Sequence, residues 1–401
     1  MKCVAIAGGG ASGMAAALTA AEDTDNRVIL FERQARVGRK LLSTGNGRCN
    51  LTNTGASVRN YCGEDPEFIL PAMGRFSPES NLQFFRDLGL VCTEQYGGRV
   101  FPLSDSAGSV LDVLRFSLES RNVEIHTAEP IQRAYHSGKG FQIFTEQKDY
   151  SADCFIVACG GKAGGKLGGV GDGYDLLRAF GHRCTKLHPS LVPIFTDTDF
   201  PRSLKGIRAD ASVKLFHGKT LSASGAGELQ FVEKGISGPA AFDISRCASV
   251  NGGRIEIDFL REMTAEEAEK LILLRREISP ELETLNIFAG ILQSRLGLAI
   301  VKYAGLRPSG RIRDVSDADI HRLAVSAKHF SMNVTGTDTF DNAQVTAGGI
   351  VTSEFSPETM ESRLVRNLYA CGEVLDIDGA CGGYNLQWAW ASGRLAGRLG
   401  K

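Results

Sequence analysis

The sequence lacks the cysteine spacings that mark metal-binding and disulfide-rich proteins. It has ten cysteines but no C-x-x-C pair. Structural zinc sites and thioredoxin-like redox sites depend on such pairs, and a disulfide framework belongs to short secreted chains rather than to one of 401 residues. We therefore expect no bound metal, and the cysteine usage favours a reduced, cytoplasmic setting.

An excess of charge of either sign is also missing. Lys and Arg total 45, Asp and Glu total 46, and no basic run is longer than two residues. Proteins that bind nucleic acid or anionic membranes through electrostatics carry a basic patch or stripe, and the sequence shows none. We therefore expect a small-molecule substrate, no nucleic-acid partner and no membrane association. The oligomeric state is left open.

Long hydrophobic runs are missing too. The range 4–21 has no charged residue, but four glycines interrupt it and alanine makes up most of the rest. This range is therefore expected to fold inside a globular domain and not to act as a membrane span or a signal peptide.

Several catalytic signatures have no match. The sequence contains no HExxH zinc motif, no Walker A loop and no G-x-S-x-G nucleophile elbow. The seven histidines are dispersed, and His182 and His188 are expected to be structural because no metal partner is spaced with them.

The N-terminus carries the fingerprint of a dinucleotide-binding β–α–β unit. The apolar stretch KCVAIA enters Gly8-x-Gly10-x-x-Gly13, and a small-residue helix follows. Gly8 permits the tight turn, Gly10 allows a pyrophosphate to approach the backbone, and Gly13 lets helix and strand pack closely. The first helical residues, Ala11 and Ser12, are expected at the pyrophosphate because a helix N-terminus favours negative charge.

Glu32 completes this fingerprint. It ends the next predicted strand, RVILFER, nineteen residues after Gly13. A carboxylate there can accept a hydrogen bond from a ribose 2′-hydroxyl and disfavours a 2′-phosphate. The fingerprint alone does not separate NAD from FAD.

A second glycine-rich segment near the C-terminus favours the longer cofactor, FAD. The strand YACGEV ends in Gly372-Glu373, which are expected to meet the pyrophosphate and the ribityl hydroxyls. GGYNLQ then opens a helix after Gly383, and the backbone amides of Asn385 and Leu386 are expected to point toward the flavin.

Between these segments the pattern of predicted elements changes. Short strand patterns follow residue 186, and Thr264 with Glu267 forms a capping box that opens a helical stretch. The simplest architecture is an α/β fold with an FAD-binding domain split between the two ends of the chain. We expect residues 1–187 and 336–401 to form a split Rossmann-like, three-layer domain with a parallel sheet, 188–262 an inserted β-barrel-like domain and 263–335 an inserted helical subdomain.

Three motifs carry a family resemblance. AGGGASGMAAA, GRKLLSTGNGRCNLTN and LYACGEVLDIDGACGGYNLQWAWASGRLAG resemble the BaiN-like NAD(P)/FAD-dependent oxidoreductases, also catalogued as aminoacetone-oxidase-like FAD-binding flavoproteins. The resemblance runs nearly end to end and implies noncovalent FAD, with NAD(P)H as a transient electron donor. One segment departs from the family pattern: a Ser and a Pro usually follow the glycine pair, where this chain reads GGKAGGKLGGVGDG.

The same resemblance implies cofactor contacts along the first half of the chain. Residues 43–53, STGNGRCNLTN, are expected to run along the pyrophosphate toward the flavin, since their glycines let backbone amides approach and their asparagines can bond polar edges. The positions implied in this part are Arg33, Arg39, Lys40, Gly45, Asn46 and Ile131.

No catalytic residue is fixed by the sequence, and the candidates are Arg48, Cys49, Ser237 and Tyr384. Arg48 is placed to supply positive charge near the pyrophosphate or the reduced ring. A predicted turn at 235–239 brings Ser237 to the substrate. Cys49 has no second cysteine four residues away, so we predict a small packed residue and not a redox shuttle. In the alternative, Arg48 lowers the pKa of Cys49 and makes it reactive.

The leading functional prediction is an FAD-dependent oxidoreductase that uses NAD(P)H to reduce an activated, enone-type C=C bond in a small molecule. The alternatives are an oxidase of a small amine, a nucleic-acid-modifying flavoprotein, and an FAD-binding protein without turnover.

Overall fold

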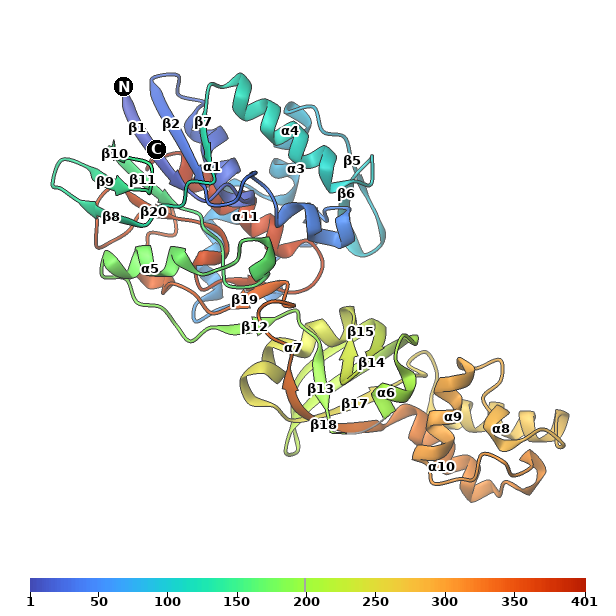
Figure 1. The fold of residues 1–401 in the computed structure, drawn as a ribbon. Helices are drawn as coiled ribbons and strands as arrows, with labels where there is room; N and C mark the ends of the chain where they lie inside the picture. Colours follow the sequence, from blue (N-terminus) through green and yellow to red (C-terminus); the bar gives the residue numbers. More distant parts are fainter. Residues whose placement is uncertain (198–199) are drawn as a thin grey trace. The chain divides into compact units, whose positions relative to one another are not determined.

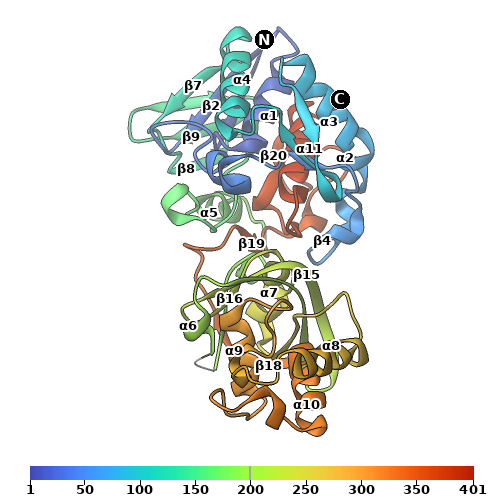
Figure 2. The same ribbon diagram turned by 90° about the vertical axis from the view of Figure 1, so that its right-hand side faces the viewer.

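The computed structural model describes residues 1–197 and 200–401, which form two compact units (Figures 1 and 2). Met1–His188 and Gln344–Lys401 form the first unit, and Pro189–Ala343 form the second. The chain passes from one unit to the other at β12 (His188–Ser190) and returns just before β19 (Val345–Ala347). Both ends of the chain therefore build one domain, which confirms the predicted split.

The first unit is organised around a five-stranded parallel sheet in the order β20–β11–β1–β2–β7. Its strands are largely continuous apolar runs, as expected of a sheet that is covered on both faces. The strands are β1 (Lys2–Ala7), β2 (Asn26–Glu32), β7 (Glu124–Thr127), β11 (Cys154–Val157) and β20 (Leu368–Ala370). The C-terminal β20 pairs with β11, so the last part of the sequence completes the sheet.

Two further layers cover this sheet (Figure 1). On one face, α1 (Ala11–Ala20) packs against α4 (Ala107–Ser120) and α11 (Tyr384–Gly397). The other face carries an antiparallel sheet of β8 (Arg133–His136), β9 (Phe141–Phe144) and β10 (Asp149–Ala152). Tyr150 of this sheet meets Phe31 of β2 edge-on at 4.8 Å. The predicted three-layer α/β fold is confirmed.

Shorter elements surround this core. Near the start of α11, β4 pairs with β21, while β3, β6 and β5 form a small antiparallel sheet. The bounds are β3 (Thr52–Asn53), β4 (Tyr61–Cys62), α2 (Leu70–Arg75), α3 (Pro78–Asp87), β5 (Cys92–Glu94), β6 (Arg99–Pro102), α5 (Asp172–Ala179) and β21 (Asp378–Gly379).

The uncharged N-terminal run divides between a strand and a helix. β1 and α1 take up most of it, and Gly8 to Gly10 form the turn between them. Of the helices in residues 1–197 and 200–401, none has both the length and the hydropathy that a membrane crossing needs.

The second unit contains a closed barrel in the order β13–β16–β15–β14–β17–β18. Its strands are β13 (Ile194–Thr196), β14 (Arg208–His217), β15 (Thr220–Val232), β16 (Gly235–Ser237), β17 (Arg254–Asp258) and β18 (Phe330–Thr337). The strand that closes it, β18, pairs with β13 and β17. The barrel thus needs a strand that lies far beyond the expected boundary at residue 262.

Helices are inserted into this barrel unit in three places. α7 (Pro239–Asn251), which the strand pattern did not predict, packs on β14 and β15. α8 (Ala265–Ile278), α9 (Ser294–Tyr303) and α10 (Asp317–Lys328) lie between β17 and β18, and α6 (Phe200–Leu204) precedes β14. The predicted capping box is present at the start of α8. Buried residues of the barrel and of these helices form one continuous core.

One local prediction in this unit is wrong. Residues 235–239 were expected to form a turn, but Gly235–Ser237 is strand β16 and Pro239 begins α7. A Cβ on Gly235 would lie 1.9 Å from the carbonyl oxygen of Ile194, so this glycine serves close strand packing. Ser237 is a barrel residue paired with Gln230.

In the first unit, α1 and α11 touch through their backbones. A Cβ on Gly393 would lie 2.3 Å from the carbonyl oxygen of Ser12, and one on Gly397 would lie 2.4 Å from that of Ala16. Both contacts advance in the same direction along the two helices, so the helices run parallel. Any larger side chain at these positions has to push the helices apart.

This contact predicts the effect of Gly393→Ala. The added methyl meets a helix carbonyl, so we expect the free energy of unfolding of the first unit to fall by about 1–3 kcal/mol, the usual cost of overpacking. Chemical unfolding followed by tryptophan fluorescence measures this directly, because the chain has two tryptophans and both lie in α11.

Gly74→Ala is the matched control, since a Cβ on this α2 glycine meets no atom of the described residues within 4 Å. It should leave stability unchanged or raise it by up to about 1 kcal/mol through helix propensity. Equal stability of both variants would show that the α1–α11 contact tolerates a side chain.

Candidate functional site

The glycine fingerprint forms a turn with open space at its centre. Gly8 has a φ of +105°, and a Cβ on Gly13 would lie 1.9 Å from the carbonyl oxygen of Gly8. Packing therefore requires both of these glycines. A Cβ on Gly10 would meet no atom of residues 1–197 and 200–401 within 4 Å. Gly10 caps α1 and has no packing reason to be glycine, so the space above it fits a pyrophosphate held by the amides of Ala11 and Ser12.

Glu32 lies beside this turn, and its carboxylate uses only part of its hydrogen-bonding capacity. One oxygen accepts a hydrogen bond from the amide of Gly9 at 2.9 Å and the other from the amide of Gln34 at 2.7 Å. Burial raises the pKa of Glu32, although these two bonds oppose the rise. Each oxygen keeps a second lone pair, which is the acceptor that a ribose hydroxyl needs.

The segment after β7 reaches the same edge of the sheet. The amide of Glu129 donates to the carbonyl oxygen of Glu32 at 3.0 Å, and the nearby Ile131 is buried. The sequence placed Ile131 at the cofactor, and the structure puts it near the ribose end of the site. No sequence pattern pointed to Glu129.

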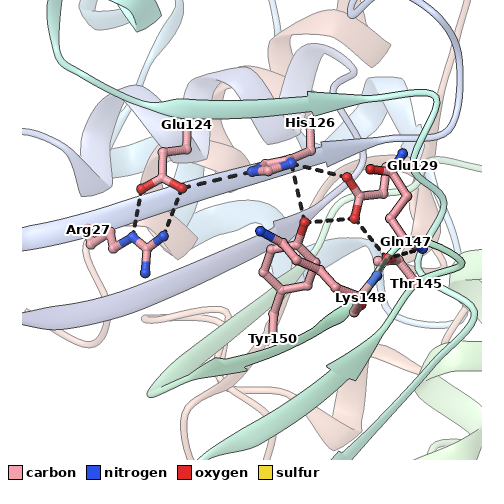
Figure 3. A network of polar contacts seen from close by, with 8 residues as sticks. All are labelled: Arg27, Glu124, His126, Glu129, Thr145, Gln147, Lys148 and Tyr150. Carbon is pink, nitrogen blue, oxygen red and sulfur yellow. Dashed lines mark hydrogen bonds and ion pairs between the residues drawn. The ribbon is translucent and has the colours of Figure 1, made fainter.

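Glu129 is the centre of a buried polar network (Figure 3). Its carboxylate accepts hydrogen bonds from the hydroxyls of Tyr150 and Thr145, each at 2.7 Å, and contacts His126 Nδ1 at 3.1 Å. Burial opposes ionisation of this carboxyl, but the bonds together outweigh burial, and the pKa of Glu129 lies below its usual value. The network ties the β8–β10 sheet to the loop that bonds Glu32.

Glu373 and Lys40, both predicted to bind the cofactor, bond to each other. Lys40 Nζ lies 2.7 Å from one carboxylate oxygen of Glu373, and the other oxygen accepts from the amide of Thr346 at 2.8 Å. The Thr346 hydroxyl accepts from the amide of Lys162 at 2.8 Å. These bonds hold the glycine-rich loop that begins at Gly160 beside the end of β20.

Three other predicted cofactor residues are also engaged with protein groups. Arg33 forms an ion pair with Asp172 at 2.8 Å, and Arg39 donates to Gln34 at 2.6 Å. Gly372, with a φ of +77°, donates its amide to Ser392 at 3.0 Å, and its carbonyl oxygen accepts from Trp388 at 3.1 Å. The amide of Gly372 is therefore used to join β20 to α11.

The segment 43–53 lies along the start of α11. Its backbone is left-handed at Gly45, Asn46, Gly47 and Cys49. Trp390 Nε1 donates to the carbonyl oxygen of Leu51 at 2.9 Å. This backbone explains why the segment is rich in glycine and asparagine, because these residues adopt the left-handed conformation readily.

A buried acceptor in this segment lacks a partner. Asn50 Oδ1 is buried and makes no hydrogen bond to any described residue. It is close to Gly383, where an added Cβ would come within 2.8 Å of it. A buried polar atom without a partner costs stability, so this oxygen fits a hydrogen-bond donor on the edge of a bound ring.

The first turn of α11 faces this acceptor. Gly383 is the N-cap, with a φ of +99°, and no side chain within the described residues caps the helix. The side chain of Asn385 exchanges two hydrogen bonds of 2.8 Å with the backbone of Gly379, so it fixes the turn and leaves its backbone amide for a ligand. The carbonyl oxygen of Tyr384 accepts from the hydroxyl of Tyr61 at 3.0 Å.

Arg48 turns away from the expected cofactor path. Its Nε lies 2.5 Å from Asp105, another guanidinium nitrogen donates to Gln95 at 3.0 Å, and the guanidinium sits 4.2 Å from the centre of the Phe101 ring. Cys49 is fully buried, and burial raises its pKa to about 12. Burial and the ion pair of Arg48 with Asp105 therefore favour the packed, unreactive Cys49 over the alternative in which Arg48 makes it reactive.

Together, the parallel sheet, the open turn at Gly10 and the second helix N-terminus at Gly383 define a two-part dinucleotide-binding domain of the flavin-dependent oxidoreductase class. The chain belongs to the HI0933-like protein Rossmann domain family, whose model matches residues 2–399. The predicted family resemblance and the predicted class, an FAD-dependent oxidoreductase, are confirmed.

Three known proteins illustrate this relationship. The chain is 39% identical over 404 residues to a 3-dehydro-bile acid delta(4,6)-reductase from Clostridium scindens, covering 99% of this chain and 98% of that protein. It is 29% identical to a ribosomal RNA dihydrouridine synthase from Haemophilus influenzae, covering 96% and 95%. A 3-ketosteroid-delta4-(5alpha)-dehydrogenase from Rhodococcus jostii aligns with a TM-score of 0.49 at 15% identity, covering 99% and 96%.

The burial of Cys49 predicts the electron capacity of the protein. Cys49→Ser should retain FAD and accept two electrons per flavin in an anaerobic dithionite titration, as the parent does, because a free buried thiol takes no part in electron uptake. If the parent takes up four electrons per flavin and the variant two, Cys49 belongs to a redox-active disulfide.

Proposed function

We propose that the protein uses electrons from NAD(P)H to reduce a carbon–carbon double bond that is conjugated to a carbonyl group in a small molecule. The observation that carries this proposal is the similarity, along 99% of the chain, to a reductase of such a compound. Overall, one NAD(P)H and one proton convert the C=C bond to a CH–CH bond and release NAD(P)⁺.

The chemistry requires that negative charge on the reduced cofactor be stabilised. FAD, once bound and reduced by NAD(P)H, would supply hydride chemistry at this site. The amides of Asn385 and Leu386 lie at the positive end of α11, where they stabilise negative charge on the reduced cofactor. Asn50 Oδ1 is an acceptor for a donor on the edge of the flavin ring. Glu32 would bind the other end of FAD through a ribose hydroxyl.

The sequence supports transient binding of NAD(P)H. It contains one dinucleotide fingerprint, which lies in the first unit. With one permanent site, NAD(P)H has to bind, transfer its hydride and leave before the acceptor enters.

A second candidate acceptor is uridine in RNA. The relative from Haemophilus influenzae is a ribosomal RNA dihydrouridine synthase. The C5=C6 bond of uracil is also conjugated to a carbonyl group, so the same hydride addition applies. The net charge of −1 provides little attraction to a phosphate backbone, and for this reason we place the small molecule first.

Anaerobic reduction distinguishes these acceptors. The purified protein is expected to release FAD on heating, and the flavin absorbance should bleach when NADH or NADPH is added. A 3-oxo-Δ4 steroid should then restore the oxidised spectrum faster than a uridine-containing RNA hairpin or a small amine. The cofactor-free protein serves as the control and should consume no NAD(P)H.

Two results would contradict the proposal. If the RNA is the one acceptor that reoxidises the flavin rapidly, the activity is nucleic-acid modification. Bleaching by an amine, followed by fast reoxidation with oxygen and no response to enones, would identify an amine oxidase.

A further inference from the structure

Gln387 is a buried glutamine in the first turns of α11 that connects three parts of the chain. Its Oε1 accepts a hydrogen bond from the hydroxyl of Thr52 at 2.7 Å and another from the side-chain amide of Asn81 at 3.1 Å. Its Nε2 donates to the carbonyl oxygen of Phe76 at 2.9 Å. Gln387 is 0% exposed, and Thr52 and Asn81 are each 1% exposed.

This arrangement leaves little freedom to the carboxamide. Both acceptor positions of Oε1 are used, and the donor that meets Phe76 fixes which side of the group is nitrogen. Asn81 is fixed in turn, because its Oδ1 accepts from Arg394 at 2.9 Å while the guanidinium lies 4.2 Å from the centre of the Phe76 ring. The hydrogen bonds on both sides of the Gln387 carboxamide therefore favour a single geometry.

The network joins the two segments that face the candidate flavin position. Thr52 follows Asn50 in the 43–53 segment, and Gln387 lies one helical turn after the N-cap, its amide donating to the carbonyl oxygen of Gly383 at 3.0 Å. The bond between Thr52 and Gln387 therefore fixes the Asn50 acceptor relative to the first-turn amides of α11. These are the groups that would bind opposite parts of one polar ring edge.

We propose that Gln387 is a positioning residue for the flavin. By setting the geometry between the Asn50 acceptor and the amides of Asn385 and Leu386, it determines how tightly FAD binds and how easily the bound flavin is reduced. This inference rests on the proposed FAD-dependent function and adds to it a residue that does not itself touch the cofactor.

Two substitutions separate positioning from packing. Gln387→Met keeps the volume of the side chain but removes its hydrogen bonds to Thr52, Asn81 and Phe76. Asn81 and Phe76 keep a bond to each other at 3.2 Å, so the buried Thr52 hydroxyl is the group that loses its acceptor. Gln387→Glu can accept from Thr52 and Asn81, but an ionised carboxylate also turns an oxygen toward the Phe76 carbonyl. When protonated, the glutamic acid donates to that carbonyl as the glutamine does. Because burial raises the pKa of a carboxyl group, this exchange should fall within an accessible pH range.

The test is to measure the dissociation constant of FAD, the visible spectrum and the flavin midpoint potential from pH 5 to 9. Gln387→Met should weaken FAD binding by about tenfold or more at every pH, the scale of an unpaired buried polar group. Gln387→Glu should approach the wild type at low pH and lose affinity as the carboxyl ionises. Gln142→Glu, in which the replaced glutamine bonds Ser151 on the β8–β10 sheet, is the matched control and should follow the wild type.

Each outcome bears on the proposal. If both Gln387 variants keep the wild-type FAD affinity, spectrum and potential, the residue is structural only, even if the cofactor-free variants unfold more readily. If Gln387→Met does not fold, the pH series of Gln387→Glu decides, and a flat series overturns the inference. A wild-type protein that binds no FAD would overturn the proposed function as well, so the two failures are distinguishable.

Discussion

The close contact between α1 and α11 is the constraint on which the rest of the site depends. Gly393 rests on Ser12 and Gly397 on Ala16, so the two helices run side by side in the same direction. α11 begins nine residues before Gly393 and α1 one residue before Ser12, so the N-terminus of α11 lies eight residues, or about 12 Å at 1.5 Å per residue, beyond that of α1. Two positive helix ends at this spacing suit an extended dinucleotide, with the pyrophosphate at one end and the flavin ring at the other.

Backbone amides, the neutral acceptor of Asn50 and the Glu32 carboxylate make up this site, while the positively charged side chains predicted to lie near it are paired within the protein. Lys40 bonds Glu373, and Arg48 bonds Asp105. Amides held by the fold need little rearrangement when charge develops on a ligand, which is the property that electrostatic stabilisation requires. The polar residues behind the site, such as Gln387, serve to hold those amides in place.

Local patterns in the sequence predicted the features that depend on residues close together in the chain. The Gly8–Gly13 fingerprint, the split domain and the capping box at Thr264 follow from spacing and residue type alone. The parts that depend on distant partners were missed. Arg48 was expected at the cofactor for its positive charge, and its partner Asp105, 57 residues away, was not foreseen. Gln387 was not singled out because its partners Thr52 and Phe76 are distant in the sequence.

The most direct test of this account is hydrogen–deuterium exchange of the wild-type protein with and without FAD. The first-turn amides of α1 and α11 have no acceptor within their own helix, so they should exchange quickly in the cofactor-free protein. If one dinucleotide bridges both helix ends, adding FAD should slow exchange in residues 11–13 and in residues 384–386 together. Protection of one of these segments without the other would contradict the two-ended site.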